Sequence, residues 1–259
     1  MATALPDLQT EYRRLLADRT CVVTGSSRGI GKHIALEFGR HGADVAVNYR
    51  SSAGAATEVT DTITEFGTDA IAVRADVSDP TDVNHFAETV HDELGTVDVL
   101  VNNAGQTADG LFQKMTPAQW HRVIEVNLNG VFNCTRTFFE DIQSADEGRI
   151  INVSSVVGQQ GNVGQANYAA SKSALSGFTR TLALELAPFG STANCIAPGF
   201  TETDMLEHVP ESVREKILAR VPLGRFADPE ELVGIARLLA SEESSYITGQ
   251  VIGVNGGMR

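Results

Sequence analysis

The glycine-rich segment TGSSRGIG, residues 24–31, is the feature that most constrains the fold of this chain. It follows a short apolar run, residues 21–24, and leads into a segment with the apolar spacing of a helix. A strand, a glycine turn and a helix in this order are typical of dinucleotide-binding domains, because glycines let the backbone approach a pyrophosphate at the helix N-terminus. The glycine spacing is G-x-x-x-G-x-G rather than the commoner G-x-G-x-x-G, so a tight turn without a ligand is the alternative. The candidate cofactor residues of this turn are Gly25, Ser27, Arg28, Gly29, Ile30 and Gly31.

Apolar runs and amphipathic segments alternate along the rest of the chain. This alternation predicts a Rossmann-like, doubly wound α/β fold with a parallel sheet of about seven strands and helices on both faces. Further strands are predicted over residues 44–48, 70–77, 97–101, 149–153, 191–196 and 249–258. Helices are predicted over residues 52–66, 117–143, about 165–187 and 228–240, and one more helix ends at about residue 93, before the fourth strand. We expect a single domain over residues 19–259, after an N-terminal extension of residues 1–18, with a small lid over about 201–220.

Length and cysteine content set the class of protein. The 259 residues suit one continuous α/β domain, and no linker, low-complexity tract or internal repeat divides them. The cysteines, Cys21, Cys134 and Cys195, are odd in number and lack the spacing of metal ligands, so neither a disulfide framework nor a metal site is predicted. No segment has the apolar length of a signal peptide or of a membrane span. These features predict a cytoplasmic protein.

The charge balance is strongly acidic. Thirty-three acidic against twenty basic residues give a net charge of −13, which argues against binding to nucleic acid or to an anionic membrane. Only four lysines occur (Lys32, Lys114, Lys172 and Lys216), against sixteen arginines. Acid-rich, lysine-poor surfaces resemble those of proteins from a salt-loaded cytoplasm, and an ordinary acidic enzyme is the equally favoured alternative.

The end of the second predicted strand indicates which nicotinamide cofactor is used. An NAD-specific fold places an acidic residue near this position to bind the ribose 2′-hydroxyl. This chain has Arg50 there, and Arg28 is available from the glycine turn. Because a guanidinium matches the oxygens of a 2′-phosphate, we predict NADPH rather than NADH. A solvated loop arginine is the alternative for Arg50.

Polar residues at the ends of the third and fourth predicted strands are further cofactor candidates. Asp76 and Val77 end the third strand at the carboxyl edge, where Asp76 can contact the adenine. A helix N-cap role is the alternative for Asp76, although Asp79 looks the better cap. The fourth strand leads into NNAG, in which Asn103 and Gly105 suit a turn beneath the cofactor and equally suit a turn beneath nothing.

A candidate carbonyl-reduction site comes from Ser155, Tyr168 and Lys172. Tyr168 and Lys172 are four residues apart, so on a helix both side chains leave the same face, and the ammonium can favour the ionised phenol. Ser155, at the mouth of a strand, can bond a carbonyl oxygen. Asn127 lies on a mainly apolar helix face, where a buried amide must find partners, either by bracing the helix or by holding a water near Lys172. A chance Tyr-x-x-x-Lys pair is the alternative when the motif stands alone.

With TGSSRGIG, NNAG, Asn127, Ser155, Tyr168-x-x-x-Lys172 and PGF-x-x-T in this order, residues 19–257 resemble the short-chain dehydrogenase/reductase family. The resemblance implies that Ser155 orients the substrate carbonyl and that Tyr168 protonates its oxygen as hydride arrives. It implies that Lys172 binds the nicotinamide ribose and lowers the pKa of the tyrosine, and that Asn127 holds the water of a proton relay. Family spacing selects Ser155 rather than Ser154, which would face the other way on an extended strand. Further implied cofactor residues are Pro198, Gly199, Thr201 and Thr203, and the candidate substrate residues are Gln159, Gln160, Gln165 and Phe200.

Within that family, three segments look like those of the 3-oxoacyl-thioester reductases: GQANYAASK (164–172), APGFTETDM (197–205) and YITGQ (246–250). That group includes 3-oxoacyl-[acyl-carrier-protein] reductases and acetoacetyl-CoA reductases, which are NADPH-dependent and usually tetrameric. The resemblance therefore implies a homotetramer.

The carrier of the thioester is predicted from charge and from local resemblance. Acyl carrier protein is acidic, whereas this chain has the acidic stretch QSADEG at 143–148 and has Asn133 and Leu184 where arginines would help binding. The segments around Phe112 and Trp120, and GQQG at 158–161, look more like acetoacetyl-CoA reductases. We therefore expect NADPH-dependent reduction of acetoacetyl-CoA to 3-hydroxybutyryl-CoA, as in polyhydroxyalkanoate metabolism. The alternatives are a 3-oxoacyl-[acyl-carrier-protein] reductase, an alcohol or sugar dehydrogenase, and a nucleotide-binding protein without catalysis.

Overall fold

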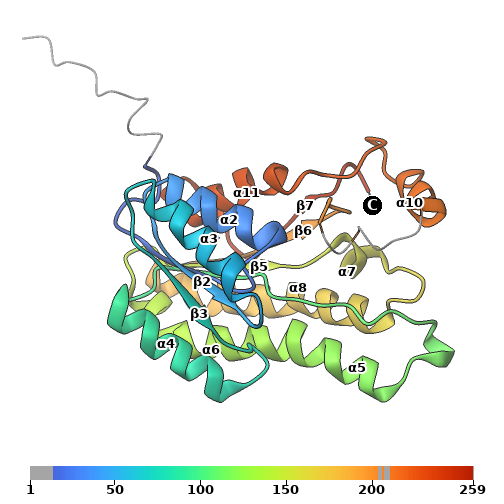
Figure 1. Cartoon of the computed structure of the whole chain (residues 1–259), viewed down its shortest axis with the longest axis horizontal. Helices are drawn as coiled ribbons and strands as arrows, with labels where there is room; N and C mark the ends of the chain where they lie inside the picture. The colour runs from blue at the N-terminus through green and yellow to red at the C-terminus, as the bar shows by residue number, and fades with distance from the viewer. Residues whose placement is uncertain (1–13, 204–205, 207–210, 259) are drawn as a thin grey trace, which may run out of the picture.

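The computed structural model describes residues 14–203, 206 and 211–258, which form one parallel sheet with helices on both faces (Figure 1). The described strands lie in the order β3-β2-β1-β4-β5-β6-β7, and each neighbouring pair is parallel. The predicted fold class is confirmed. The strands are β1 (Thr20–Val23), β2 (Asp44–Tyr49), β3 (Ala70–Arg74), β4 (Val99–Asn102), β5 (Arg149–Val153), β6 (Thr192–Pro198) and β7 (Val251–Val254). The α-helices are α2 (Gly29–Arg40), α3 (Ala53–Thr64), α4 (Pro80–Glu93), α5 (Pro117–Ile124), α6 (Gly130–Ser144), α7 (Val156–Gln160), α8 (Ala166–Leu186), α10 (Glu211–Leu218) and α11 (Val233–Ala240).

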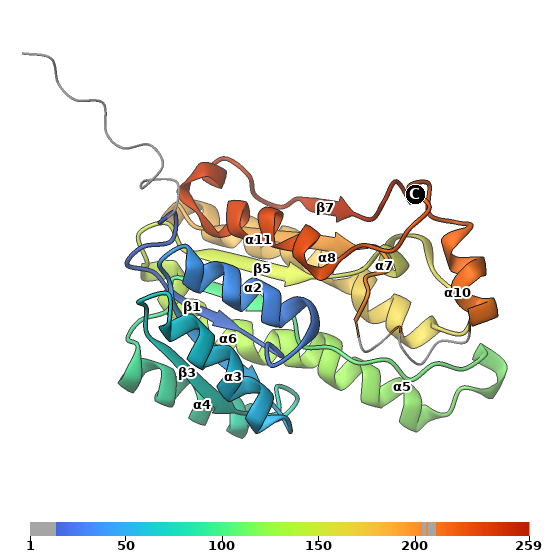
Figure 2. The same cartoon turned by 45° about the horizontal axis from the view of Figure 1, so that its top comes forward.

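The central strands are buried on both faces, which explains why β1 and β4 are largely apolar rather than alternating. On one face, α2, α3 and α11 pack on a core cluster that includes Phe38 and Val45. On the other face, α4, α6 and α8 pack on a second cluster that includes Leu100 and Phe138 (Figure 2). No helix among the described residues is both long and apolar enough to cross a lipid bilayer.

The carboxyl edge of the sheet is where ligands of such folds bind. The chain order reverses between β1 and β4, and in open α/β sheets this reversal opens a crevice beyond the strand ends. Figure 2 shows α7 and α10 beyond the carboxyl ends of β5 and β7, on the same side of the sheet. The glycine turn after β1 and the NNAG segment after β4 therefore meet at the expected ligand edge.

The helix predicted over residues 117–143 is not continuous. The structure has α5, then a π-helical turn over Glu125–Asn129, then α6. The π turn adds a residue to the helix and changes the direction of the Asn127 side chain, which makes its hydrogen bonds outside the helix. Such turns recur at functional sites, and apolar periodicity does not predict them.

Smaller differences concern element ends. The third strand ends at Arg74 rather than at residue 77, because its partner β2 ends at Tyr49 in the paired register. Asp79 caps α4 as predicted, accepting a hydrogen bond from Thr81 N at 2.8 Å. Leu16, from the predicted N-terminal extension, is fully buried and packs in the core. Residues 1–13 of that extension, and residues 204, 205 and 207–210 of the predicted lid, lie outside the described residues.

At the amino edge of the sheet, a buried guanidinium ties β5 to its neighbours. The Arg149 side chain is fully buried, and its Nη2 lies 2.8 Å from Glu147 Oε2. Arg149 Nε also donates to the carbonyl oxygen of Ser241, which follows α11. Arg19 shares the same carboxylate, with its Nη2 3.7 Å from Glu147 Oε2. Glu147 therefore balances two guanidiniums, one of which has no access to water.

Replacing Glu147 with Gln should lower the free energy of unfolding by about 2–4 kcal/mol, because Arg149 would stay charged and buried without the carboxylate that it bonds. Urea unfolding followed by circular dichroism measures this. The exposed Glu88→Gln on α4 is the matched control, with an expected change within about 0.5 kcal/mol. Equal stability of the two variants would contradict the assignment of Glu147 as the balancing charge.

Candidate active site

The glycine turn is fixed to the end of β4 by hydrogen bonds. Thr24 Oγ1 accepts from the backbone N–H groups of Asn103 at 2.9 Å and Ala104 at 3.0 Å. The Asn103 side chain donates to the carbonyl oxygens of Thr24 and Gly25. Gly25 has a φ of +62°, and a Cβ there would lie 2.9 Å from the Ala104 Cα. The side chain of Asn103 therefore supports the glycine turn, and its place beneath a cofactor stays a prediction.

The N-terminus of α2 opens on a cleft that suits an anionic ligand. The cleft has a volume of about 410 Å³, and its lining residues are Ser27, Arg28, Gly29, Lys32, His33, Ala55, Glu202, Thr203 and Pro229. The N-cap residue Arg28 makes no side-chain capping bond, and the first turn of α2 carries no acidic residue. The first N–H groups of the helix therefore face the cleft together with two cationic side chains, which is the donor set that a pyrophosphate requires.

Arg50 and Asp76 lie together at the ends of β2 and β3. Arg50 Nη1 is 3.7 Å from Asp76 Oδ2, and more than half of the Arg50 side chain is exposed. Asp76 also accepts two hydrogen bonds from Ser78. Burial alone would raise the pKa of Asp76, but the bonds from Ser78 and the charge of Arg50 hold this pKa below its usual value. The neighbouring Val77 carbonyl accepts a bond from Asn133, so that backbone oxygen is used within the fold.

The remaining predicted cofactor residues follow β6. Gly199 N donates to the Val254 carbonyl oxygen at 2.9 Å, and a Cβ on Gly199 would lie 2.8 Å from the Asn255 Cα. Thr201 is buried, and its hydroxyl donates back to Gly199 O. Thr203 lies beside the glycine turn at the cleft, since a Cβ on Gly29 would be 3.6 Å from Thr203 Cγ2. The segment after Pro198 therefore closes one side of the cleft.

Ser155, Tyr168 and Lys172 come together as predicted from their spacing. Ser155 is the N-cap of α7, and its hydroxyl accepts from Val157 N at 3.1 Å and hydrogen bonds to Tyr168. Tyr168 and Lys172 lie one turn apart on α8, with Lys172 Nζ 5.9 Å from the centre of the tyrosine ring. The neighbouring Ser154 is turned away, and its hydroxyl donates to the Lys172 carbonyl oxygen at 2.7 Å.

The pKa of Tyr168 is shifted in the direction opposite to the predicted one, in which Lys172 lowers it. Burial raises the pKa of Tyr168, the Asp109 carboxylate adds to this effect, and the bond to Ser155 opposes it. Lys172 Nζ donates instead to the Val153 carbonyl oxygen at 2.7 Å. Burial lowers the pKa of Lys172 to about 8. In this structure both groups are shifted toward their neutral forms.

Asn127 connects the π turn to the loop after β4. Its side chain is fully buried, accepts from Gln106 N at 2.9 Å, and donates to Gln106 O at 3.0 Å and Ser171 Oγ at 3.2 Å. A Cβ on Gly105 would lie 3.4 Å from both Asn127 Oδ1 and Lys172 Nζ, so these three residues meet. The amide therefore braces the loop against α8, and its role in holding a relay water stays a prediction.

The four predicted substrate residues have different environments. Gln159 and Gln160 are exposed at the end of α7. Gln165 uses its side chain within the fold, donating to Asp109 Oδ2 at 3.0 Å. Phe200 packs, as Tyr168 does, on a small apolar cluster formed by Val156, Val157, Val221 and Met258. Of the four, Phe200 is therefore the one that shares a surface with Tyr168.

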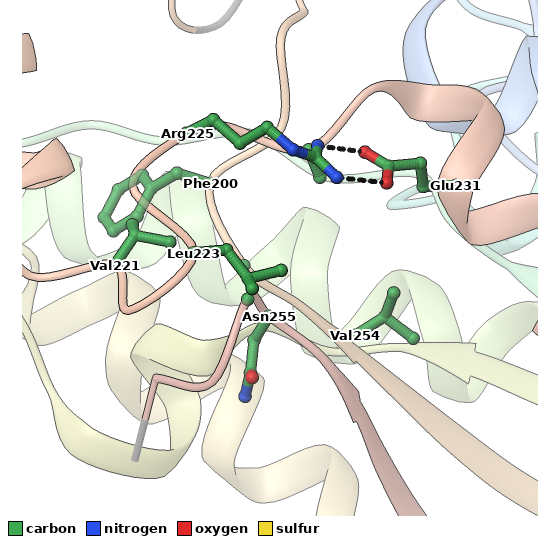
Figure 3. Close-up of a pocket in the computed structure, with 10 residues that line it drawn as sticks. Phe200, Val221, Leu223, Arg225, Glu231, Val254 and Asn255 are labelled. Carbon is green, nitrogen blue, oxygen red and sulfur yellow. Dashed lines mark hydrogen bonds and ion pairs between the residues drawn. The ribbon is translucent and has the colours of Figure 1, made fainter.

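A second pocket, of about 100 Å³, adjoins Phe200 (Figure 3). Figure 3 shows Phe200 and Val221 on one side of it and, on another, the guanidinium of Arg225 facing the Glu231 carboxylate. That ion pair is bidentate, with N–O distances of 2.6 and 2.7 Å. The volume is below the roughly 300 Å³ that is typical of small-molecule sites.

Comparison with known proteins identifies the family. A family model described as enoyl-(acyl carrier protein) reductase matches residues 25–259. A 3-oxoacyl-[acyl-carrier-protein] reductase FabG of Staphylococcus aureus (strain Mu50 / ATCC 700699) is 44% identical over 240 residues, which cover 93% of this chain and 98% of that protein. A 3-oxoacyl-[acyl-carrier-protein] reductase of Synechocystis sp. (strain ATCC 27184 / PCC 6803 / Kazusa) is 46% identical over 244 residues, covering 94% of this chain and 98% of that protein. The chain belongs to the short-chain dehydrogenase/reductase family.

The family assignment agrees with the architecture. The crystal structure of a 3-oxoacyl-[acyl-carrier protein] reductase from Brucella melitensis ATCC 23457 matches with a TM-score of 0.90 at 32% identity, covering 100% of this chain and 97% of that one. As a short-chain dehydrogenase/reductase, the protein is an oxidoreductase that acts on a carbonyl or hydroxyl group with a nicotinamide cofactor. The predicted enzyme class and family group are confirmed.

Two residues of this short-chain reductase site were not predicted. Thr24 precedes the glycine turn and holds it to β4, and its place as the last residue of an apolar run was the available signal. Asp109 follows NNAG by four residues and raises the pKa of Tyr168. Nothing in the sequence marks Asp109, because only the fold brings it near α8.

Replacing Lys172 with Met should stabilise the cofactor-free enzyme by about 1–3 kcal/mol at neutral pH while abolishing turnover, because it removes a buried ammonium. The depressed pKa sets the pH window. The charged lysine costs stability in full below about pH 8, and the cost disappears as pH rises from about 8 toward the unfolded value of about 10.4. The stability difference should therefore shrink above about pH 8.

Urea unfolding at several pH values measures this difference, with the exposed Lys216→Met as the matched control. A stability difference that is independent of pH, or a less stable Lys172→Met at neutral pH, would contradict the shift.

Proposed function

We propose that this enzyme is an NADPH-dependent 3-oxoacyl-[acyl-carrier-protein] reductase. The observation that carries the proposal is the similarity to two reductases of that name at 44% and 46% identity over 98% of their lengths. The contacts among Ser155, Tyr168 and Lys172 support reduction of a carbonyl group. The name of the matching family model refers to enoyl substrates, so reduction of a carbon–carbon double bond is included in the test below.

The residues of the site support the following division of labour. The nicotinamide cofactor supplies a hydride when bound. Ser155 bonds the substrate carbonyl oxygen and keeps it beside Tyr168. Tyr168, whose buried phenol is protonated at neutral pH, gives its proton to that oxygen. Lys172, held at the Val153 carbonyl 5.9 Å from the ring centre, favours the phenolate that remains, and Asn127 keeps the loop at Gly105 in place.

The preference for acetoacetyl-CoA that we predicted from the sequence is not confirmed. That prediction used the net charge and the absence of arginines at Asn133 and Leu184, but docking of a carrier depends on charges near the site. Exposed cations occur on α10, which lies beyond the carboxyl end of β7 in Figure 2, and directly after it, namely Lys216 and Arg220. These positions are compatible with an acidic carrier, so the relatives' names favour the alternative. Cytoplasmic location, a tetramer and a high-salt habitat stay predictions from the sequence.

With NADPH, kcat/KM should be at least about tenfold higher for acetoacetyl-[acyl carrier protein] than for acetoacetyl-CoA at ~0.1 M salt. The ratio should fall at ~1 M salt, because screening weakens charge contacts between protein surfaces. NADPH oxidation followed spectrophotometrically measures both values. A preference for CoA at both salt concentrations would return the assignment to the acetoacetyl-CoA reductases.

Two controls accompany this assay. Tyr168→Phe should lower turnover with both carriers by about 10²-fold or more while leaving NADPH binding intact, since the proton donor alone is lost. Crotonyl thioesters should leave NADPH unconsumed. Turnover of crotonyl but not acetoacetyl thioesters would support an enoyl reductase instead.

The choice of NADPH depends on Arg50, which follows β2, with Arg28 lining the cleft at the N-terminus of α2. Arg50→Ala should raise the KM for NADPH about tenfold or more and leave the KM for NADH nearly unchanged, because only NADPH carries the 2′-phosphate. Arg74→Ala is the matched control. Arg74 lies at the end of β3, and its side chain donates through Nε to the backbone carbonyl oxygen of Arg50, so this variant leaves the Arg50 guanidinium in place. An equal effect of Arg50→Ala on both cofactors would contradict phosphate recognition.

A further inference from the structure

The cleft at the N-terminus of α2 suits an anionic ligand, yet one carboxylate lines it. Among the residues that line this cleft in the described part of the chain, Glu202 alone is acidic, and Arg28 and Lys32 are the cations. A negative charge at such a place repels an anion such as a pyrophosphate and offsets the attraction of the helix N-terminus. The cleft therefore holds a group that weakens binding of an anion unless its charge is balanced.

The backbone keeps Glu202 at the rim of the cleft. Glu202 N donates to Ala227 O at 2.9 Å, and the preceding Thr201 forms a parallel bridge with Ala227. The following Thr203 lies beside the glycine turn, with its Cγ2 3.6 Å from the position of a Cβ on Gly29. Glu202 is thus held between two residues whose places are fixed by the fold, so its charge stays near the cleft.

Arg214, on α10, balances this charge. Its Nη2 donates to Glu202 Oε1 at 2.7 Å, whereas Glu211 of the same helix is farther away, at 3.7 Å from Arg214 Nε. Arg214 Nη1 also donates to Leu206 O at 3.2 Å, and its guanidinium carbon lies 4.9 Å from the centre of the Phe226 ring. The guanidinium is therefore held in place where it faces the Glu202 carboxylate.

We propose that Arg214 is a positioning residue for the cofactor. Its ion pair with Glu202 neutralises the carboxylate at the rim of the cleft, so that the phosphates of a nicotinamide dinucleotide can bind at the N-terminus of α2. Arg214 acts through Glu202 rather than by contact with the cofactor. The proposal rests on the NADPH-dependent function proposed above and adds a residue outside the predicted cofactor set.

The alternative is that Arg214 only attaches α10, because it also contacts Leu206 and Phe226. Two properties separate these roles. A charge effect on the cofactor requires the Glu202 carboxylate and weakens as salt screens it. The attachment of α10 requires neither the charge of Glu202 nor low salt.

The first test is NADPH binding to the free enzyme, followed by the fluorescence of the bound nicotinamide. Arg214→Met removes the charge and keeps an unbranched side chain over Phe226. It should raise the Kd for NADPH about threefold to tenfold at ~0.1 M salt, because the unpaired Glu202 repels the phosphates. At ~1 M salt the increase should fall below about twofold. An unchanged Kd at low salt, or an equal increase at both salt concentrations, would overturn the proposal.

The second test removes the carboxylate as well. In the double variant Glu202→Gln with Arg214→Met, the Kd should return to within about twofold of the wild-type value, because no unpaired charge remains. Glu202→Gln alone should bind NADPH at least as tightly as the wild type, which tests the sign of the effect without a change in α10. The proposal is wrong if the double variant binds as weakly as Arg214→Met, or if Glu202→Gln alone weakens binding.

Arg225→Met is the matched control. Arg225 forms a similarly short ion pair with Glu231, at 2.6 and 2.7 Å, but neither residue lines the cleft at α2. The two arginine variants change the net charge equally, so Arg225→Met should leave the Kd for NADPH within about twofold of the wild-type value. An increase as large as that of Arg214→Met would show an effect of net charge and would overturn the specific role of Arg214.

Binding is measured without a thioester, so the proposed function and the role of Arg214 can fail separately. If the Kd values follow the expected pattern but no 3-oxoacyl thioester is reduced, the proposed substrate is wrong and the role of Arg214 is supported. If thioesters are reduced but the pattern of Kd values is absent, the reductase is supported and the role of Arg214 is overturned.

Discussion

The meeting of the first and fourth strand ends is the contact on which the site depends. Thr24 accepts the backbone N–H groups of two residues after β4, and the Asn103 side chain bonds the carbonyl oxygens of the glycine turn. These bonds fix the turn at the point where the strand order reverses, and so fix the N-terminus of α2 at the cleft lined by Ser27, Arg28 and Gly29. The same loop continues through Gly105 to Asp109, so one connection places both the glycine turn and the surroundings of Tyr168.

Desolvation is the second constraint, and it acts on both Tyr168 and Lys172. Tyr168 and Lys172 are both shifted toward their neutral forms by burial. A neutral phenol is the form that can protonate a carbonyl oxygen, and the Tyr168 phenol is neutral at pH 7 with or without the shift. The buried ammonium of Lys172 costs folding stability and is retained against only one backbone hydrogen bond, to Val153. Residues that lower stability in this way are expected at sites where selection acts on activity.

The sequence predicted most of the fold because the apolar runs of a doubly buried parallel sheet and the glycine turn are local signals. It also predicted which serine of the pair faces Tyr168, because side chains alternate along an extended strand. It did not predict the π turn at Asn127, whose cause is a loop distant in sequence, or the direction of the Tyr168 pKa shift. Both depend on burial and on partners such as Gln106 and Asp109, which only the folded chain brings close.

The carrier of the acyl group could not be predicted from net charge, because docking depends on the charges near the site rather than on their sum over the chain. The net charge of −13 describes the whole molecule, and at physiological salt a charge acts over only about 8 Å. A docking partner therefore responds to the few charged groups around the site, where cations such as Lys216 and Arg220 stand among acidic residues. Arg220 is in addition engaged by Asn162, so its charge is held in place rather than spread over many rotamers. A fixed cation at the edge of an acidic protein can attract an acidic partner that the molecule as a whole repels.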